Sequence, residues 1–92
     1  MSAIQIFALP LMKARLNRTP EDYSMDLLLS AVLEAAEAEL SKESGPLVED
    51  SPDDLMLLVD AAVWNYQSRD KATGMPEWLR HKRKQRFLRA RP

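Results

Sequence analysis

The stretch SPDDLMLLVDAAVWNYQSRD, residues 51–70, decides how this chain folds. It opens with Ser51, a residue type that caps helix N-termini, and Pro52 follows at the first helical position, where a missing N–H costs nothing. Apolar residues then recur at helical spacing and form one broad stripe: Leu55, Leu58, Val59, Ala62, Val63 and Tyr66. The sequence therefore predicts a central helix over residues 51–70.

A second, narrower apolar stripe lies roughly opposite the first on the same predicted helix. It comprises Leu57, Ala61 and Trp64. A helix that is apolar on two sides is usually covered on two sides. One cover is the core of the chain itself, and the other is either more of the same small bundle or another molecule. These three residues are therefore candidates for an intramolecular or a subunit contact.

Length and composition bound the class of protein. A chain of 92 residues forms one domain with a modest core. The absence of cysteine rules out a disulfide scaffold and a thiolate metal site. Residues 1–9 lack the basic region and cleavage site of a signal peptide, and no apolar run approaches the roughly 20 residues of a membrane span. We expect a soluble cytoplasmic protein that has no membrane partner.

The net charge of −1 hides a strong asymmetry along the chain. All 14 acidic residues lie between Glu21 and Glu77, so residues 1–79, with six basic residues, carry −8. Residues 80–92 contain seven Lys and Arg, one His and no acidic residue, and carry +7. An acidic body with a basic tail is the clearest charge signal in the sequence.

The segments before the central helix are predicted as follows. Residues 1–8 are mildly apolar but have no visible strand partner, which predicts a flexible, extended N-terminal arm. Residues 9–16 have the spacing of a short helix. A long helix then begins near Thr19 or Ser24, both capping residue types, and runs to about residue 41. The sequence Ser-Gly-Pro at 44–46 ends it.

The last segment is harder to place. Pro76 begins a final helix, and Trp78 and Leu79 dock its first turn on the core. Beyond them the apolar pattern fails, and basic residues lie all round the helical wheel. We therefore expect a frayed or conditional helix that orders on a partner. The predicted architecture is all-α, a small bundle of three to four helices over residues 9–79 with a basic C-terminal helix or tail over residues 80–92.

Chemical motifs are absent from the sequence. There is no Gly-rich phosphate loop, no G-x-S-x-G and no Cys/His pair, so we expect no enzyme activity, no cofactor and no metal. His81 stands alone among charges and is interpreted as solvated. An acidic cluster precedes the central helix but lacks the glycine of a calcium loop, and helix capping accounts for it; its members are Glu49, Asp50, Asp53 and Asp54.

The basic tail admits three interpretations. It could bind nucleic acid with strong salt dependence and no sequence preference. It could instead lie against the acidic body of the next copy of the chain, a heterologous contact that builds rings or filaments. It could also be a solvated tail with no role, although Phe87 and Leu88 argue against this because such a tail needs no apolar anchors.

The order and spacing of these segments resemble the small helical head–tail connector, or adaptor, proteins of tailed bacteriophages and prophages. A short helix, PLMKARLN, precedes a long one, MDLLLSAVLEAAEAEL, which ends in the glycine turn SGPL. The end WNYQSRD looks like the aromatic end of the family's penultimate helix, and MPEWLR is similar to a Pro-x-Trp-Leu-Arg segment of members from Gram-positive phages. The resemblance covers about residues 9–90. The strongly basic tail and the acidic residues of SGPLVEDSPDD depart from the family pattern.

The resemblance implies a structural role. Members of the family form a ring of about a dozen copies beneath the portal protein, extend the DNA channel without sequence-specific DNA binding, and receive a tail or stopper protein. Such a protein would be made in the bacterial host cytoplasm and end in the virion. Together with the second stripe, the residues that we assign to these contacts are the tryptophans, as apolar anchors, and the cations of the tail with Phe87: Trp64, Trp78, Arg80, Lys82, Arg83, Lys84, Arg86, Phe87 and Arg89.

The alternative hypothesis is a small nucleic-acid-binding module or regulator that uses the tail as a basic arm. It predicts tight DNA binding at low salt and a steep salt dependence. Against it, no predicted helix pairs a basic face with an apolar face as a recognition helix does. A third class, an acidic inhibitor or mimic, is supported only by the −8 charge of residues 1–79.

Overall fold

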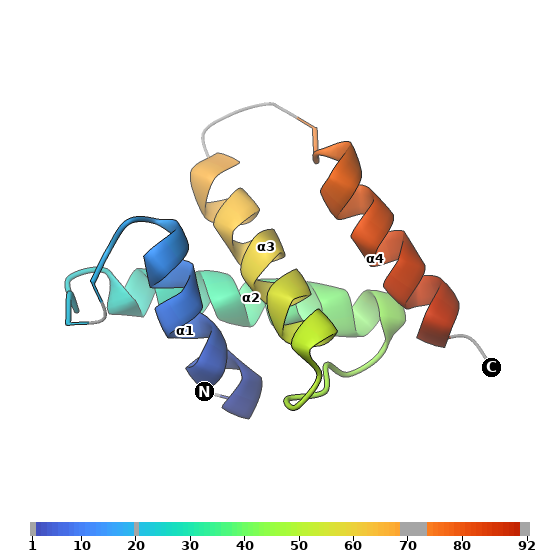
Figure 1. Ribbon diagram of the computed structural model, residues 1–92, viewed down its shortest axis with the longest axis horizontal. Helices are drawn as coiled ribbons and strands as arrows, with labels where there is room; N and C mark the ends of the chain where they lie inside the picture. The colour runs from blue at the N-terminus through green and yellow to red at the C-terminus, as the bar shows by residue number, and fades with distance from the viewer. Residues whose placement is uncertain (1, 20, 69–73, 91–92) are drawn as a thin grey trace.

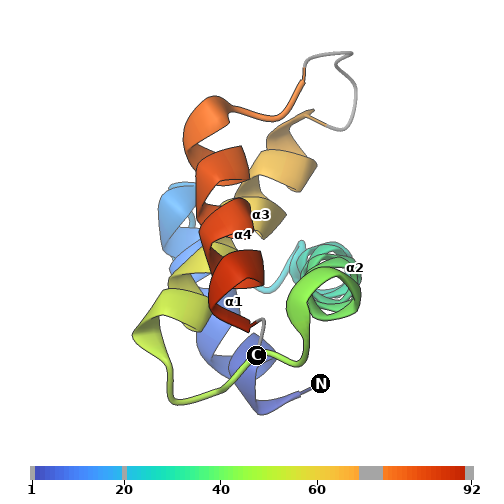
Figure 2. The same ribbon diagram turned by 90° about the vertical axis from the view of Figure 1, so that its right-hand side faces the viewer.

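The computed structural model describes residues 2–19, 21–68 and 74–90, which fold into four helices and no strand (Figure 1). The helices are α1 (Ala3–Arg15), α2 (Asp26–Ser44), α3 (Pro52–Ser68) and α4 (Glu77–Ala90). The predicted all-α class is therefore confirmed. Figures 1 and 2 show α2 crossing behind the other three, while α3 lies between α1 and α4 and contacts both.

Helix α3 is the centre of the core, as its sequence predicts. The Ser51 hydroxyl accepts a hydrogen bond from the Asp54 N–H at 3.3 Å, so the expected N-cap is present. The core lies where α3 meets α1 and α2, and its largest fully buried side chains are Met12, Leu29, Leu33, Leu40, Leu58, Val59 and Leu79. Residues 69 and 70, where the central helix was expected to end, lie outside the described residues.

The N-terminal segment corrects a prediction. An extended arm was expected over residues 1–8, but α1 already begins at Ala3, and Ser2 caps it by accepting the Gln5 N–H. Ile4, Ala8 and Met12 are spaced i, i+4 and are all buried. The short helix predicted from residue 9 therefore extends two turns further towards the N-terminus, because burying this stripe against the core stabilises helix over an extended chain.

The start of α2 also differs from the prediction. Neither Thr19 nor Ser24 caps it, and the helix begins at Asp26, whose carboxylate pairs with the buried Lys13 ammonium of α1. Ser24 instead donates its N–H and hydroxyl to Asp22, which closes a turn before the helix. The end is as expected, since Gly45 stops the helix with φ of +92°, a conformation that glycine adopts without strain.

Helix α4 is the largest departure from the sequence-based expectation. A frayed helix with little reason to pack on its own body was predicted, yet residues 77–90 form one continuous helix that contacts both α2 and α3. Leu79 is fully buried beneath its first turn. Several polar contacts of α4 are described below. No helix in the described part of the chain is both long and apolar enough to cross a membrane.

Candidate protein-interaction surfaces

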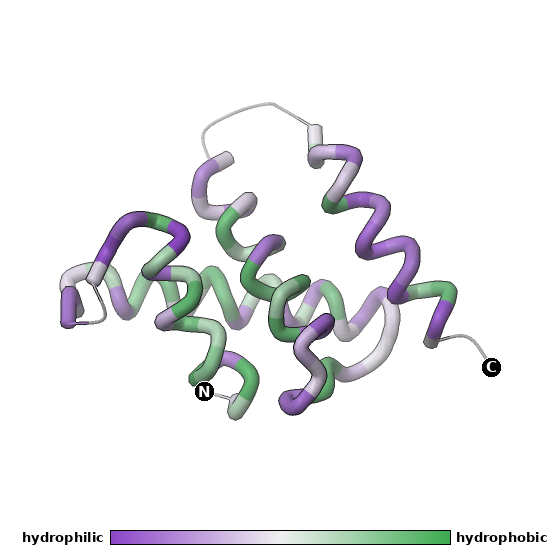
Figure 3. Tube along the Cα trace, viewed as in Figure 1, coloured by the Kyte–Doolittle hydropathy of each residue, from purple (hydrophilic) through white to green (hydrophobic). Residues whose placement is uncertain are grey.

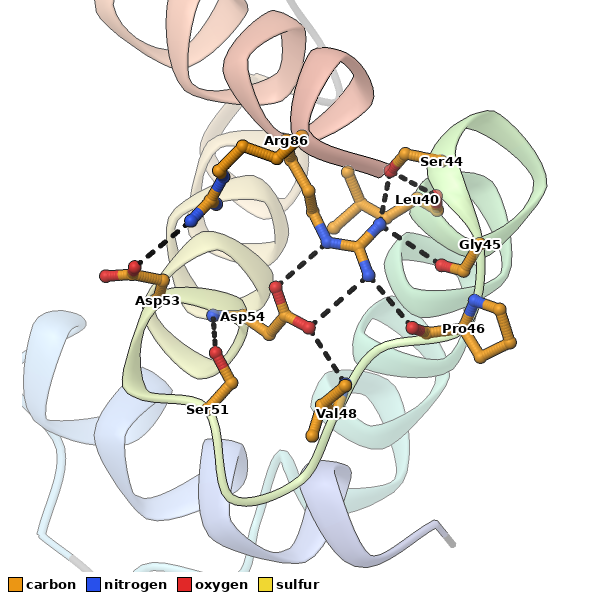
Figure 4. A network of polar contacts seen from close by, with 10 residues as sticks. Leu40, Ser44, Gly45, Pro46, Val48, Ser51, Asp53, Asp54 and Arg86 are labelled. Carbon is orange, nitrogen blue, oxygen red and sulfur yellow. Dashed lines mark hydrogen bonds and ion pairs between the residues drawn. The ribbon is translucent and has the colours of Figure 1, made fainter. Parts of the chain in front are cut away.

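Arg86 is the main link between α4 and the rest of the protein. Its side chain lies at the point where α2 ends and α3 begins (Figure 4), and the residue is only 7% exposed. The guanidinium donates to both carboxylate oxygens of Asp54, at 2.9 and 3.3 Å. It also donates to the Gly45 and Pro46 carbonyls at 3.1 and 2.9 Å, and to the Ser44 hydroxyl. One side chain thus holds three segments together.

The environment of Asp54 favours its charged form. Burial works to raise the pKa of this carboxyl, but hydrogen bonds from Arg86 and from the Val48 N–H at 2.8 Å outweigh burial, and the charges of Arg86 and Arg89 add to them. The pKa is therefore held below its ordinary value. Sequence analysis interpreted Asp54 as a helix-capping acid; Ser51 provides the cap, and the Asp54 carboxylate receives α4.

Two further cations of α4, Arg83 and Lys82, pair with the acidic body. Arg83 binds Glu39 at 2.7 Å and Glu43 at 2.9 Å, both on α2. Lys82 binds Asp60 of α3 at 2.7 Å. Burial works to lower the pKa of Arg83, but the hydrogen bonds that its guanidinium donates to the two glutamates outweigh burial and raise the pKa. The complementarity between basic tail and acidic body, which sequence analysis left open to a neighbouring copy, is thus used largely within one chain.

Asp60 extends this charge network to α1. Its side chain is 6% exposed and binds Arg15 from α1 as well as Lys82 from α4, each at 2.7 Å. A buried carboxylate requires such partners, because its desolvation is otherwise costly. Arg89 and Asp53 form a third ion pair between α4 and α3 at 3.4 Å, but both side chains are largely exposed. Asp60 was not singled out from sequence, although an acid between two apolar stripes is a usable signal.

The predicted contact residues are distributed unevenly between the interior and the surface. Leu57 and Ala61 are each 4% exposed, so the second stripe of α3 is covered by the chain itself. Trp64 is partly buried against the core. Trp78 is 49% exposed, with the Lys82 ammonium 5.6 Å from its ring centre, and Phe87 is 40% exposed. Arg80 and Lys84 point outward and form no ion pair within the described residues.

Helix α1 presents an apolar surface that sequence analysis missed. Ile6 and Phe7 are 57% and 56% exposed, and Leu11 is 39% exposed. The exposed residues of this helix up to Ala14 carry no polar side chain, and we call them the α1 face: Ala3, Ile6, Phe7, Pro10, Leu11 and Ala14. Arg15, which is also exposed and binds Asp60, borders the face at its C-terminal end. Figure 3 shows the contrast with α4, which is mostly hydrophilic. The lack of any charged residue before Lys13 was the available signal.

Two shallow grooves flank α4. One, of about 480 Å³, lies between α3 and α4, and we call it the α3/α4 groove. Its apolar lining is Met56, Leu57 and Leu88, and its polar lining is Asp53, Lys82, Gln85 and Arg89. The other, of about 580 Å³, lies between α2 and α4. Its charged lining is Glu39 and Glu43, which both bind Arg83, together with Arg80 and Lys84, which have no carboxylate partner among the described residues. The two grooves therefore differ in charge at their edges.

Within the described residues, the α1 face and the two grooves do not resemble a catalytic or metal centre. No three acidic or histidine side chains there converge as metal ligands would. His81 is exposed on α4, and neither groove contains a histidine. Comparison with protein-family models, with curated proteins and with solved structures found no match for this chain. The surfaces therefore have to be interpreted from their own chemistry.

Proposed function

We propose that this protein is a structural part of a phage or prophage particle, a head–tail connector that assembles into a ring beneath the portal protein. The observation that carries the proposal is the α1 face. Soluble monomers rarely present a whole helix face without a polar side chain, and such faces mark contacts between proteins. A connector subunit needs such surfaces, because it contacts its neighbours, the portal protein and a tail or stopper protein.

The state of α4 supports this proposal over the nucleic-acid arm. Four of its cations, Lys82, Arg83, Arg86 and Arg89, are already paired with carboxylates of the same chain. Each could bind a phosphate only by giving up its carboxylate. Within the described part of α4, Arg80 and Lys84 are left for DNA. A channel protein that lets DNA pass benefits from weak attraction of this kind.

The proposal is tested by the assembly of the full-length chain. Mass-resolved gel filtration and negative-stain microscopy are performed over a wide range of protein concentrations. We expect closed rings at high concentration and smaller species on dilution. Removing residues 80–92 is unsuitable as a test, because it deletes most of α4 and leaves the buried Asp54 unpaired. Protein that remains monomeric at every concentration would contradict ring formation.

DNA binding provides the second arm of the test. Fluorescence anisotropy with a labelled duplex is measured as a function of salt. The two cations without a carboxylate partner in the described part of α4, Arg80 and Lys84, predict weak binding, with a slope of log K against log salt of about −2 or shallower. If all seven Lys and Arg side chains of residues 80–92 bound DNA phosphates, the slope would be about −6. Nanomolar affinity with the steeper slope would favour the nucleic-acid module over the connector.

A further inference from the structure

The α1 face must be covered by something that carries little charge. Its six exposed residues offer no hydrogen-bond donor or acceptor from a side chain. Any unpaired charge placed against it would be desolvated without compensation, which costs several kcal/mol. An anionic membrane surface is a poor partner as well, because residues 1–79 carry −8. The surface that fits is apolar, and its charges are already neutralised.

The α3/α4 groove of the same chain meets both conditions. Met56 and Leu88 are 41% and 53% exposed within it, so the apolar lining is accessible. Its charged groups are paired with carboxylates, Arg89 with Asp53 and Lys82 with Asp60. Methionine adapts its shape to a partner, which suits a groove that receives a helix.

The α2/α4 groove is a less suitable receptor for the α1 face. Arg80 and Lys84 at its edge have no carboxylate partner in the described residues, so an uncharged helix would desolvate two cations there. The matching of charge therefore separates two grooves of similar size. Leu27, at 89% exposed, is another apolar residue on the surface, but it lies on the outer side of α2, away from both grooves.

We propose that the α1 face of one copy docks in the α3/α4 groove of a second copy. The two surfaces are different parts of the chain, so the contact is heterologous, and each subunit retains one free face and one free groove. Repetition of such a contact closes into a ring when the rotation between copies allows it. This inference rests on the proposed function, and it names the subunit contact that the ring would use.

The test uses two variants that each damage one side of the contact. The face variant is Phe7→Gln with Leu11→Gln, and the groove variant is Met56→Gln with Leu88→Gln. All four side chains are at least 39% exposed, and glutamine is a good helix former, so both variants should fold. Circular dichroism and urea unfolding verify this. The matched control is Leu27→Gln with Leu28→Gln, two exposed apolar residues on α2.

The decisive sample is the equimolar mixture of the two variants. Each variant alone should remain a monomer at concentrations where the wild type and the control assemble. In the mixture, the intact groove of the face variant binds the intact α1 face of the groove variant. The remaining face and groove of that pair are both damaged, so growth stops at a heterodimer. Sedimentation velocity should then show a species of about twice the 10.5 kDa chain mass.

The outcomes separate the inference from the proposed function. Rings from the wild type together with rings from either variant would overturn the inference and leave the connector proposal in place. A mixture that contains only monomers, while the wild type assembles, would overturn the inference in the same way. A wild type that never assembles would contradict both. Loss of assembly in the control alone would assign the contact to α2 and overturn the inference.

Discussion

Helices α1 and α4 flank α3 on opposite sides, and they are held there by different forces (Figure 1). Helix α1 buries Ile4, Ala8 and Met12 in the core. In the described part of α4, Leu79 is the only buried apolar side chain, and the helix is held by ion pairs around Arg86 and Arg83. Helix α1 also forms two ion pairs, Lys13–Asp26 and Arg15–Asp60, but its apolar burial does not depend on charge. The partly exposed ion pairs of α4 are weakened by salt screening. The two flanks should therefore respond differently to the same perturbation.

The largest effect is expected from Arg86→Met. This change keeps most of the length of the stem but leaves the Asp54 carboxylate and two backbone carbonyls without their donor. Removing one partner of a buried ion pair costs about 3–5 kcal/mol of unfolding free energy. Urea unfolding at neutral pH measures it. Adding Asp54→Leu should recover much of the loss, because the unpaired charge is removed as well.

A matched control for Arg86→Met is Lys84→Met, two residues away on the same helix. Lys84 is exposed and pairs with no carboxylate of the described residues, so the change should stay within about 0.5 kcal/mol. Equal stability of the Arg86 and Lys84 variants would show that the buried pair does not hold α4.

The apolar flank is tested by Met12→Ala. Met12 is fully buried on α1, and truncation of such a side chain costs about 2–5 kcal/mol through lost transfer energy and the cavity left behind. The loss should be the same at low and at high salt, unlike losses in α4. Leu27→Ala, at a residue that is 89% exposed, should be nearly neutral. If the unfolding free energy lost in the Met12 variant depended strongly on salt, α1 and α4 would not be held by different forces.

Acid should weaken the α4 flank through Asp54. Because the pKa of this carboxyl is lower in the folded protein than its ordinary value of 3.8, the unfolded chain binds more protons in that range. The resulting stabilisation is complete above pH 3.8 and is lost as the pH falls below it towards the folded-state pKa. Unfolding measured across this window should show a smaller pH dependence in Asp54→Asn. Identical pH profiles for the variant and the wild type would contradict the role of Asp54.

Among the variants that remove an ion pair or a buried side chain, Arg89→Ala should have the smallest effect. The Arg89–Asp53 pair spans 3.4 Å, and its side chains are 61% and 77% exposed. Ion pairs of this kind contribute about 0–1 kcal/mol and are screened by salt. If Arg89→Ala lowered the unfolding free energy as much as Arg86→Met, the contribution of an ion pair between α4 and α3 would not depend on its exposure to solvent.

The same contrast explains what the sequence could predict. The cap at Ser51, the buried stripe of α3 and the stop at Gly45 each follow from local chemistry, and all three are present. The docking of α4 depends on distant carboxylates such as Asp54 and Asp60, which no periodicity reveals. The hydrophobic pattern of residues 77–90 alone therefore predicted a helix that does not pack on the rest of the chain. Pairing +7 with −8 inside the chain was the simpler interpretation of the same charges.

The candidate surface was missed for a related reason. The high charge of residues 80–92 predicts an interaction surface there, but several of its cations bind carboxylates of the same chain. The sequence predicts an arm over residues 1–8 and a short helix from residue 9, and two separate segments of this kind do not form one continuous surface. Once α1 is continuous, Phe7 and Leu11 fall one turn apart on its exposed side. Whether one side of a helix is exposed depends on which other helices pack against it, and this is known only from the three-dimensional structure.

The most direct test of this account is native-state amide hydrogen exchange of the full chain, followed by NMR at low salt and in 1 M NaCl. We expect amides in the middle of α4 to be protected at low salt and to lose part of that protection in 1 M salt, where the screening length falls to about 3 Å. The loss comes from the partly exposed pairs of Lys82 and Arg83, because the buried Arg86–Asp54 pair is screened much less. Amides of α1 should keep theirs. Protection of α4 that is already absent at low salt, or that is unchanged by salt, would contradict docking by charge.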